Sequence, residues 1–323
     1  GEYFSSGLEF QYGLTQAIGS DSPLTTTNDE SHQKVRKFCR EQEFGRHSIQ
    51  NSIHSIAAVA LGFVDSLGVE ETINFTRTIP LYTLEQTKTN VLKSDFNVEE
   101  TATVISAAEE RITNMMLLHV KPLVVTTFQD LMQRESCLQR LEDIAEGIIK
   151  DINATGIIRH LQDSKEQRGV HPFSDEEIKS LTKTILFIGS GTTKSALISA
   201  LYSLMQSPAI QEELYNGIKE IDLSDSPSLY EQLEKNETLS RFFMELLRLY
   251  PPIMFQVRKA NEAFSIHYTN EIPIPKGTGL YLSLYHSYRD NRRWEDPTTF
   301  NPSRFKQLNS SDTRLQFVNK LNP

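Results

Sequence analysis

The stretch that decides the fold is "ILFIGSGTTKSAL", residues Ile185–Leu197. Two interpretations of it compete. Taken as a strand that enters a glycine-rich loop ending in Lys-Ser, it would indicate the phosphate-binding loop of an NTPase. Taken as a helix, it is a long apolar segment with a weak point in its middle. The neighbouring sequence decides between the two.

The phosphate-loop interpretation fails at both of its glycine positions. The motif is G-x-x-x-x-G-K-[ST], but here Thr193 precedes Lys194 and Ile188 stands where the first glycine belongs. Upstream, Ser174 and Glu177 have the spacing of a capping box, which predicts the start of a helix. We therefore favour a helix. The NTPase alternative predicts saturable nucleotide binding that depends on Lys194, and we expect none.

A helix must account for Gly189 and Gly191, since each glycine destabilises a helix interior by about 1 kcal/mol relative to alanine. The hydroxyls of Thr192 and Thr193 can also bond to the carbonyl one turn earlier and bend the helix. One explanation is close packing of a neighbouring segment against the glycines. The other is a small or flat ligand that lies in the groove with a hydroxyl aimed at it. The sequence leaves both open.

The bulk composition excludes several classes of protein. The 323 residues carry 33 Lys+Arg against 42 Asp+Glu, a net charge of -9, without a basic tract. Such a chain is a poor binder of nucleic acid, and we predict no nucleic-acid partner. Cys39 and Cys137 match neither a disulfide framework nor a zinc spacing, so we predict no metal ligand among these residues. No window has the about 20 apolar residues of a membrane-spanning helix.

Sequence patterns divide the chain into a helical part and a small β part. Residues 1–252 carry apolar side chains at helical spacing in several long segments. After Pro252, short alternating runs surround a Pro-Lys-Gly turn, as in small hairpins, and an irregular segment rich in Pro, Asp and Asn follows. We predict one mostly α domain over residues 1–323, with the hairpins and the irregular segment in residues 253–323.

A third motif links the helical part to the irregular segment. In "MELLRLYPP", Glu245 and Arg248 stand at i,i+3 on one helix face, and Arg304 follows downstream in "PSRF". A glutamate between two arginines predicts a buried triad that holds the irregular segment onto the helix. Loss of one member of such a network is strongly destabilising.

The order of these motifs resembles the cytochrome P-450 superfamily, the haem-thiolate monooxygenases. The shared features are Gly-x-x-Thr-Thr in a long helix, Glu-x-x-Arg before "RLYPP", and Pro-x-Arg-Phe after "WEDPTTFN". The resemblance implies the P-450 fold, incomplete at both ends, with residues 253–323 reaching the start of the meander. It also implies an enzyme that inserts one oxygen atom from dioxygen into an apolar organic substrate, with electrons from a reductase or a ferredoxin.

The resemblance further implies roles for single residues. His32 and Arg36 match a His-x-x-x-Arg pattern over the haem propionates, and Arg258 matches a further propionate-binding arginine. Groups of this kind neutralise carboxylates by charge-assisted hydrogen bonds. The same helix as Arg36 would face the redox partner with its basic side chains Lys34, Arg36, Lys37 and Arg40.

The glycine-rich helix matches the oxygen side of the haem pocket. Gly189 and Gly191 would give dioxygen room over the iron. Thr192 matches the family threonine that helps to deliver protons, and Gly191 and Thr193 flank it in the predicted catalytic segment. The haem would activate dioxygen, while the protein would orient the reacting groups, set the polarity of the pocket and provide protons.

Three departures from the family pattern shape the expectations. Gly191 stands where the family carries an acidic residue of the proton relay, and Ile188 replaces a small residue. Neither Cys39 nor Cys137 matches the haem-ligating cysteine. We therefore expect a fragment, with the axial cysteine beyond Pro323 and the first elements before Gly1.

Two expectations follow for the whole protein. Its compartment would be the cytoplasm if it is bacterial-like, or the endoplasmic reticulum membrane if an N-terminal anchor is missing. The alternative function is a degenerate, haem-free scaffold of the same fold that binds a small apolar ligand or a protein partner. A reading frame that continues into the cysteine loop would argue against that alternative.

Overall fold

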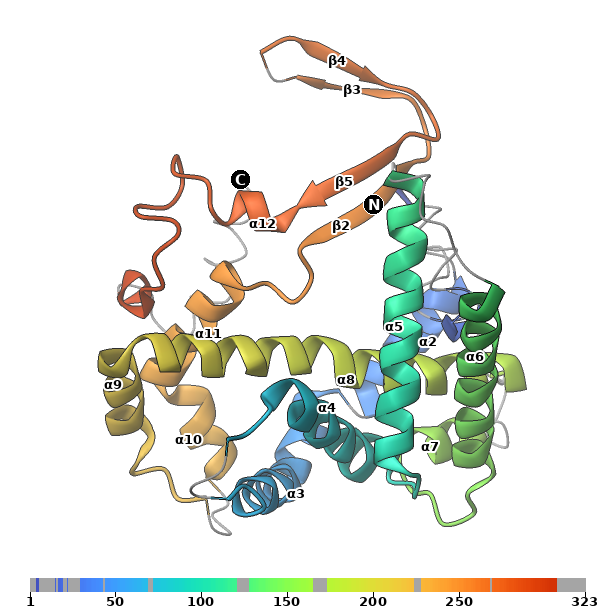
Figure 1. Cartoon of the computed structure of the whole chain (residues 1–323), viewed down its shortest axis with the longest axis horizontal. Helices are drawn as coiled ribbons and strands as arrows, with labels where there is room; N and C mark the ends of the chain where they lie inside the picture. The colour runs from blue at the N-terminus through green and yellow to red at the C-terminus, as the bar shows by residue number, and fades with distance from the viewer. Residues whose placement is uncertain are drawn as a thin grey trace. The chain divides into compact units, whose positions relative to one another are not determined.

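The computed structural model describes residues 4–5, 15, 17–19, 22, 30–42, 44–68, 72–120, 128–164, 173–223, 228–267 and 269–306. Over these ranges the predicted mostly α class with a small β part is confirmed (Figure 1). The helices are α2 (Glu30–Gln42), α3 (Arg46–Asp65), α4 (Phe75–Gln86), η1 (Thr87–Leu92), α5 (Val98–Val120), α6 (Phe128–Lys150), α7 (Ile157–Ser164), α8 (Asp175–Gln206), α9 (Pro208–Ile218), α10 (Leu229–Lys235), α11 (Glu237–Leu249), α12 (Leu284–Ser287) and η2 (Pro302–Phe305). The strands are β1 (Phe4–Ser5), β2 (Phe255–Ala260), β3 (Phe264–His267), β4 (Glu271–Ile274) and β5 (Gly279–Ser283).

The chain divides into two compact units. Unit 1 consists of Gly1–Ile49, Pro80–Gly191 and Val257–Tyr281, and unit 2 of Gln50–Ile79, Thr192–Gln256 and Leu282–Pro323. Their borders differ from the boundary at residue 252 between the predicted helical and β parts, and the expected single domain stays a prediction. Helix α8 belongs to unit 1 up to Gly191 and to unit 2 from Thr192.

The glycine-rich stretch is helical throughout, so the interpretation as a strand and a phosphate loop is wrong. Helix α8 runs without a break from Asp175 to Gln206. The predicted capping box forms at its start. The backbone N–H of Glu177 donates to Ser174 Oγ over 3.1 Å, and the backbone N–H of Ser174 donates to Glu177 Oε2 over 2.7 Å. This box satisfies two backbone donors at the end of the helix and fixes where α8 begins.

The length of α8 bears on the expectation about membrane spans. Among the described helices, α8 alone is long and apolar enough to cross a membrane by length and composition, with 28% of its most apolar window buried. The expectation that no such segment exists was therefore wrong by this criterion. The same length and composition suit a core helix, and the N-terminal part of α8 contributes buried side chains to unit 1.

Unit 1 has a core made by helices that are distant in sequence. Helices α5 and α6 pack side by side, and α7 contacts both α2 and η1 (Figure 1). The side chains buried at the centre come from α2, α4, η1, α5, α6, α7 and α8, and include Leu84, Leu92, Ile105, Leu141, Ile148, Ile157, Leu161 and Leu186. Burial of each such side chain contributes roughly 1.5–3 kcal/mol relative to exposure.

The predicted hairpins form the β part. Strands β3 and β4 pair antiparallel with Phe264 opposite Ile274, and strands β1, β2 and β5 form a second sheet in the order β1-β2-β5. The Pro-Lys-Gly turn lies between β4 and β5. Gly277 adopts a φ of 87° there, a conformation that favours glycine, and its N–H donates to the carbonyl of Ala260.

Unit 2 packs around α11. Its core consists of Ala200, Leu214, Phe242 and Leu246, with Tyr250 and Phe300 packed against them. The ring of Phe242 meets that of Phe300 edge to face with centroids 5.6 Å apart. The irregular segment that contains Phe300 is thus held to α11 by apolar contacts as well as by the ion pairs described below.

Candidate functional site

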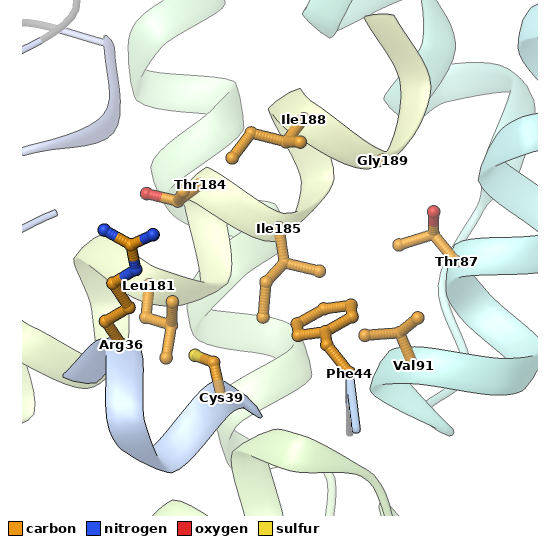
Figure 2. A pocket seen from close by; sticks show the side chains of 10 residues that line it. All are labelled: Arg36, Cys39, Phe44, Thr87, Val91, Leu181, Thr184, Ile185, Ile188 and Gly189. Carbon is orange, nitrogen blue, oxygen red and sulfur yellow. The ribbon is translucent and has the colours of Figure 1, made fainter. Parts of the chain in front are cut away.

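An apolar cavity of about 460 Å³ lies in unit 1 between α2, η1 and α8 (Figure 2). Figure 2 shows Arg36 on one side of it, Thr87 and Val91 on the opposite side, and Ile185 and Phe44 pointing inward. The complete lining is Arg36, Cys39, Phe44, Thr87, Val91, Leu181, Thr184, Ile185, Ile188 and Gly189. The cavity therefore offers apolar walls with one permanent positive charge, which suits an apolar group that carries an acid.

Helix α8 gives the cavity one wall through the spacing of its residues. Leu181, Thr184, Ile185 and Ile188 recur at three- and four-residue intervals, which places them on one face of the helix. The hydroxyl of Thr184 is already engaged, because it donates to the carbonyl of Ser180 over 2.7 Å. This wall is consequently apolar in character.

Helix α2 contributes the charge. Val35 is buried in the core, whereas Arg36 is exposed at the rim of the cavity and Cys39 lies one turn further on. Lys34 lies 4.0 Å from the carboxylate of Glu177 and 4.1 Å from the centre of the Phe173 ring. Lys34 of the predicted basic surface therefore has its contacts within unit 1, while Lys37 and Arg40 remain exposed.

The third wall comes from η1, a π-helix that the sequence analysis did not predict. It continues α4 over Thr87–Leu92 and ends at Lys93, which adopts a left-handed conformation with φ of 47°. Thr87 is almost fully buried, and its hydroxyl donates to the carbonyl of Thr83 over 3.0 Å. Segments of π-helix are rare and often occur at functional sites.

Gly189 brings α8 and η1 into close contact. A Cβ atom added at residue 189 would collide with the hydroxyl oxygen of Thr87. Of the two explanations for the glycines that the sequence left open, helix packing accounts for the missing side chain at Gly189. Gly189 also lines the cavity, so its backbone remains accessible to a ligand.

Gly191 faces a different neighbour, Glu109 on α5. A Cβ atom added at residue 191 would lie 2.8 Å from Oε1 of Glu109, closer than real Cβ contacts allow. Since this carboxylate is the far end of a flexible, half-buried side chain, a side chain at residue 191 would require Glu109 to shift. The sequence analysis did not single out Glu109, because nothing in its local sequence distinguishes it from the exposed Glu110 beside it.

The other predicted haem-site residues are placed as follows. His32 lies in α2, but its side chain is outside the described residues. Arg258 lies in β2, does not line the cavity, and donates from Nη1 to the carbonyl of Val257 over 2.8 Å. Thr192 is partly buried and Thr193 exposed, and both fall in unit 2. Among the site residues predicted in unit 1, the cavity brings together Arg36 and Gly189.

In unit 2, Glu245 binds both arginines of the predicted triad. Arg248 donates from Nε to Glu245 Oε2 over 2.7 Å and from Nη2 to Oε1 over 2.9 Å. Arg304 donates from Nε to the same Oε1 over 3.0 Å. Glu245 and Arg248 are fully buried, and the side chain of Arg304 is 12% exposed.

The two arginines extend the triad into the irregular segment through backbone carbonyls. Arg248 reaches those of Tyr288, Pro297 and Thr299, and Arg304 reaches those of Glu295, Asp296 and Thr299. The backbone N–H of Asn301 donates to Glu245 Oε1 over 2.8 Å. This network gives a segment without regular secondary structure a defined path, because buried polar groups require partners.

A second glutamate with two cations lies in unit 1. Glu142 on α6 accepts from Lys183 over 2.6 Å and lies 2.9 Å from Lys179, both on α8. Burial opposes ionisation of Glu142, but the hydrogen bonds from Lys183 and Lys179 outweigh it and lower the pKa of the carboxyl. The hydrogen bond to Glu142 likewise raises the pKa of Lys179.

In the described part of the chain, no group of three or more His, Cys, Asp and Glu side chains could hold a metal ion. Cys137 is buried on α6, and Cys39 lines the cavity as a single thiol.

Comparison with known proteins identifies the family and the fold of this chain. The family model "Cytochrome P450" matches residues 1–319. A cyanobacterial structure described as "Retinoic acid bound cyanobacterial CYP120A1" shares the fold with a TM-score of 0.78 and 19% identity, over 96% of this chain and 69% of that chain. The cavity beside a long helix and the buried glutamate with two arginines thus belong to a cytochrome P450 fold.

Relatives by sequence agree. Probable cytochrome P450 4d20 of Drosophila melanogaster is 32% identical over 42% of this chain and 26% of its own length. Human cytochrome P450 4Z1 is 26% identical over 70% of this chain and 46% of its own length. The plant enzyme (+)-vincadifformine 19-hydroxylase of Catharanthus roseus is 29% identical over 54% of this chain. The chain belongs to the cytochrome P450 family and spans about a quarter to a half of these relatives.

Proposed function

We propose that the protein carrying this chain is a haem-dependent monooxygenase that inserts one oxygen atom from dioxygen into an apolar organic substrate. The observation that carries this proposal is the cavity along α8, which combines apolar walls with the guanidinium of Arg36. Membership of the cytochrome P450 family supports it. Electrons would come from a reductase or a ferredoxin, for which the exposed Lys37 and Arg40 offer a positive surface.

The residues present fit haem, which is a flat apolar ring with two carboxylates. Ile185, Ile188 and Val91 would contact the ring and keep water away, and Arg36 would bind a propionate by charge-assisted hydrogen bonds. Arg258 and His32 are proposed as further propionate partners on the family pattern. The axial ligand is proposed to be a cysteine outside Gly1–Pro323. Bound haem would supply the activation of dioxygen.

The part of α8 around the glycines would serve the oxygen side of that group. Gly189 leaves its backbone accessible at the cavity wall. The hydroxyls of Thr192 and Thr193 are proposed to hold and pass protons. The substrate would lie in an apolar environment, since the described lining contains no acidic side chain.

The first test is the reduced carbon-monoxide spectrum of the full-length protein. A thiolate-type band is expected, and its absence in a folded protein would favour the haem-free scaffold instead. The second test is Arg36→Leu, which should weaken retention of haem because one charged partner of a propionate is lost. Lys37→Ala on the same helix is the matched control, and it should retain haem like the wild type, because Lys37 does not line the cavity.

A further inference from the structure

A polar hollow of about 310 Å³ lies in unit 1 at the C-terminal end of η1, and it shares no lining residue with the apolar cavity. Its walls come from the end of η1 with the turn that follows it, and from the turn between α6 and α7. The lining carries two ammonium groups, on Lys88 and Lys93, and two carboxylates, on Asp95 and Asp151. Whether the polar hollow suits a cation or an anion therefore depends on which of these groups are already engaged.

Asp151 is used by the fold itself. Its Oδ2 accepts from the hydroxyl of Ser94 over 2.7 Å and from the backbone N–H of Asp95 over 3.2 Å, and its Oδ1 accepts from the backbone N–H of Asn153 over 2.9 Å. The hydrogen bond from Ser94, together with those from the two backbone donors, lowers the pKa of the Asp151 carboxyl. Because a carboxylate has about four acceptor sites, Asp151 ties the two turns together and has little capacity left for a cation.

Asp95 is the opposite case, because the fold does not depend on its carboxylate. Its side chain is 92% exposed, and its Oδ1 lies 2.6 Å from Nζ of Lys88. An ion pair with so exposed a carboxylate contributes little to stability, so Asp95 can turn into water and leave its place to another acceptor. Lys88 is held by a second contact, since its Nζ also donates to the carbonyl of Phe96 over 3.2 Å.

Lys93 supplies the second positive charge. Within the described part of the chain, its ammonium group has no hydrogen bond and no ion pair. The backbone of Lys93 is left-handed, with a φ of 47°, where a glycine would be less strained. The polar hollow thus carries an uncompensated positive charge at a position that favours a residue without a side chain.

The carbonyl groups at the end of η1 do not oppose an anion. Those of Val91 and Leu92 face the start of α7, where a Cβ atom added at Gly156 would collide with both oxygens. The carbonyl of Lys93 accepts from the backbone N–H of Thr155 over 3.2 Å. The negative end of this helix is therefore covered by the start of α7 and is not turned into the polar hollow.

We infer that the polar hollow is a binding site for a small oxyanion of the phosphate class, held between the ammonium groups of Lys88 and Lys93. The exposed side-chain amide of Asn153 lines the same space and can donate a further hydrogen bond. In the free protein, Asp95 takes the place of the anion at Lys88. Charge-assisted hydrogen bonds are the strong ones available to such a ligand. This site lies outside the proposed haem pocket and does not depend on the proposed monooxygenase function.

The first experiment measures binding of inorganic phosphate to the full-length protein through the rise in melting temperature with phosphate concentration. A ligand that binds only the folded state gives a rise that follows its affinity. Lys93→Gln, which removes the charge and keeps most of the length, should weaken phosphate binding about tenfold.

The matched control for Lys93→Gln is Lys150→Gln. Lys150 is 74% exposed, pairs with Glu146 and does not line the polar hollow, so its variant should bind phosphate like the wild type. Comparing the two variants at the same phosphate concentration cancels the general stabilisation of folded proteins by phosphate. Equal phosphate affinity of Lys93→Gln and Lys150→Gln would overturn the inference.

Asp95→Asn separates an anion site from a cation site by the sign of its effect. Removing the carboxylate frees Lys88, so phosphate should bind up to about fivefold more tightly. A divalent cation held by Asp95 and Asp151 predicts the reverse, namely Mg²⁺ binding that Asp95→Asn abolishes and a phosphate affinity that it leaves unchanged. Tighter phosphate binding by Asp95→Asn supports the oxyanion site, and unchanged or weaker phosphate binding counts against it.

Discussion

Glu245 in unit 2 and Glu142 in unit 1 each bind two cations, yet their surroundings differ. Glu245 and its partner Arg248 are fully buried, and the arginines continue into backbone carbonyls. Glu142 is 28% exposed, and Lys179 has further carboxylates of Glu146 and Glu176 within 4 Å. The number of ion pairs therefore does not determine how much they stabilise the fold. What matters is how many buried groups lose a partner when one member is removed.

The largest expected effect is that of Glu245→Ala. It leaves the guanidinium of Arg248 buried without its anion and also removes the acceptor for Arg304 and for the backbone N–H of Asn301. We expect a loss of about 3–5 kcal/mol in the free energy of unfolding, measured by urea titration. Glu237→Gln on the same helix, which removes the ion pair of the exposed Glu237 with the partly exposed Arg241, should lower the free energy of unfolding by less than about 0.5 kcal/mol.

The next effect is that of Arg248→Lys, which keeps the charge but not the geometry. Lysine donates from a single nitrogen and cannot reach the carbonyls of Tyr288 and Pro297 while it binds Glu245. Because buried carbonyls are left without a donor, we expect the free energy of unfolding to fall by about 2–3 kcal/mol. Trp294, 5.1 Å from the guanidinium and the single tryptophan of this chain, offers a fluorescence probe of this loss.

A result for Arg248→Lys equal to that of Arg241→Lys, its partly exposed counterpart on α11, would contradict this account. It would mean that only charge matters in the buried triad. The contrast between buried and half-exposed pairs would then have no energetic basis.

The fold class and the start of α8 were predictable from sequence, because they depend on residues close to one another in the chain. The capping box needs only Ser174 and Glu177, and the i,i+3 spacing brings Glu245 to Arg248 in any helix. Arg304 was predicted as their partner from its place in the downstream segment "PSRF", although the contact joins residues that are 59 positions apart.

The cavity was less predictable, because its walls depend on contacts between distant segments. Thr87 meets Gly189 across about a hundred residues of sequence, and η1 adopts the π form that local patterns do not signal. Glu109 opposite Gly191 is a similar case, since two adjacent glutamates on α5 look alike until the helices are packed. Of the lining, the resemblance to the family predicted Arg36 and Gly189, and the other walls became apparent only from the tertiary structure.

A smaller effect is expected for Glu142→Gln. Lys179 has Glu146 and Glu176 within 4 Å, whereas the side chain of Lys183 is 10% exposed and is left with the amide oxygen of the glutamine. We therefore expect the free energy of unfolding to fall by about 1–2 kcal/mol at pH 7. The lowered pKa of Glu142 adds a pH signature. A carboxyl with a folded-state pKa below the ordinary 4.5 contributes stability above that pH and loses it as the pH falls through the folded value.

The difference in the free energy of unfolding between the wild type and Glu142→Gln should therefore be constant from pH 7 down to about pH 5. It should shrink below about pH 4.5. Urea titrations of both proteins over this range measure it. A difference that grows on acidification would have the wrong sign for a lowered pKa and would refute the assignment.

The smallest expected effect is that of added salt on the stability costs of Glu142→Gln and Glu245→Ala, which should differ. At 1 M salt the Debye length falls to about 3 Å, so ions screen the half-exposed contacts of Glu142 but do not enter the buried triad. The cost of Glu142→Gln should decrease by about 0.5 kcal/mol between 0.1 and 1 M sodium chloride, while the cost of Glu245→Ala should stay the same. Comparing each variant with the wild type at the same salt concentration cancels the general effect of salt on apolar burial. Equal salt dependence of the two costs would mean that water and ions reach Glu245, and the contrast drawn from burial would then be wrong.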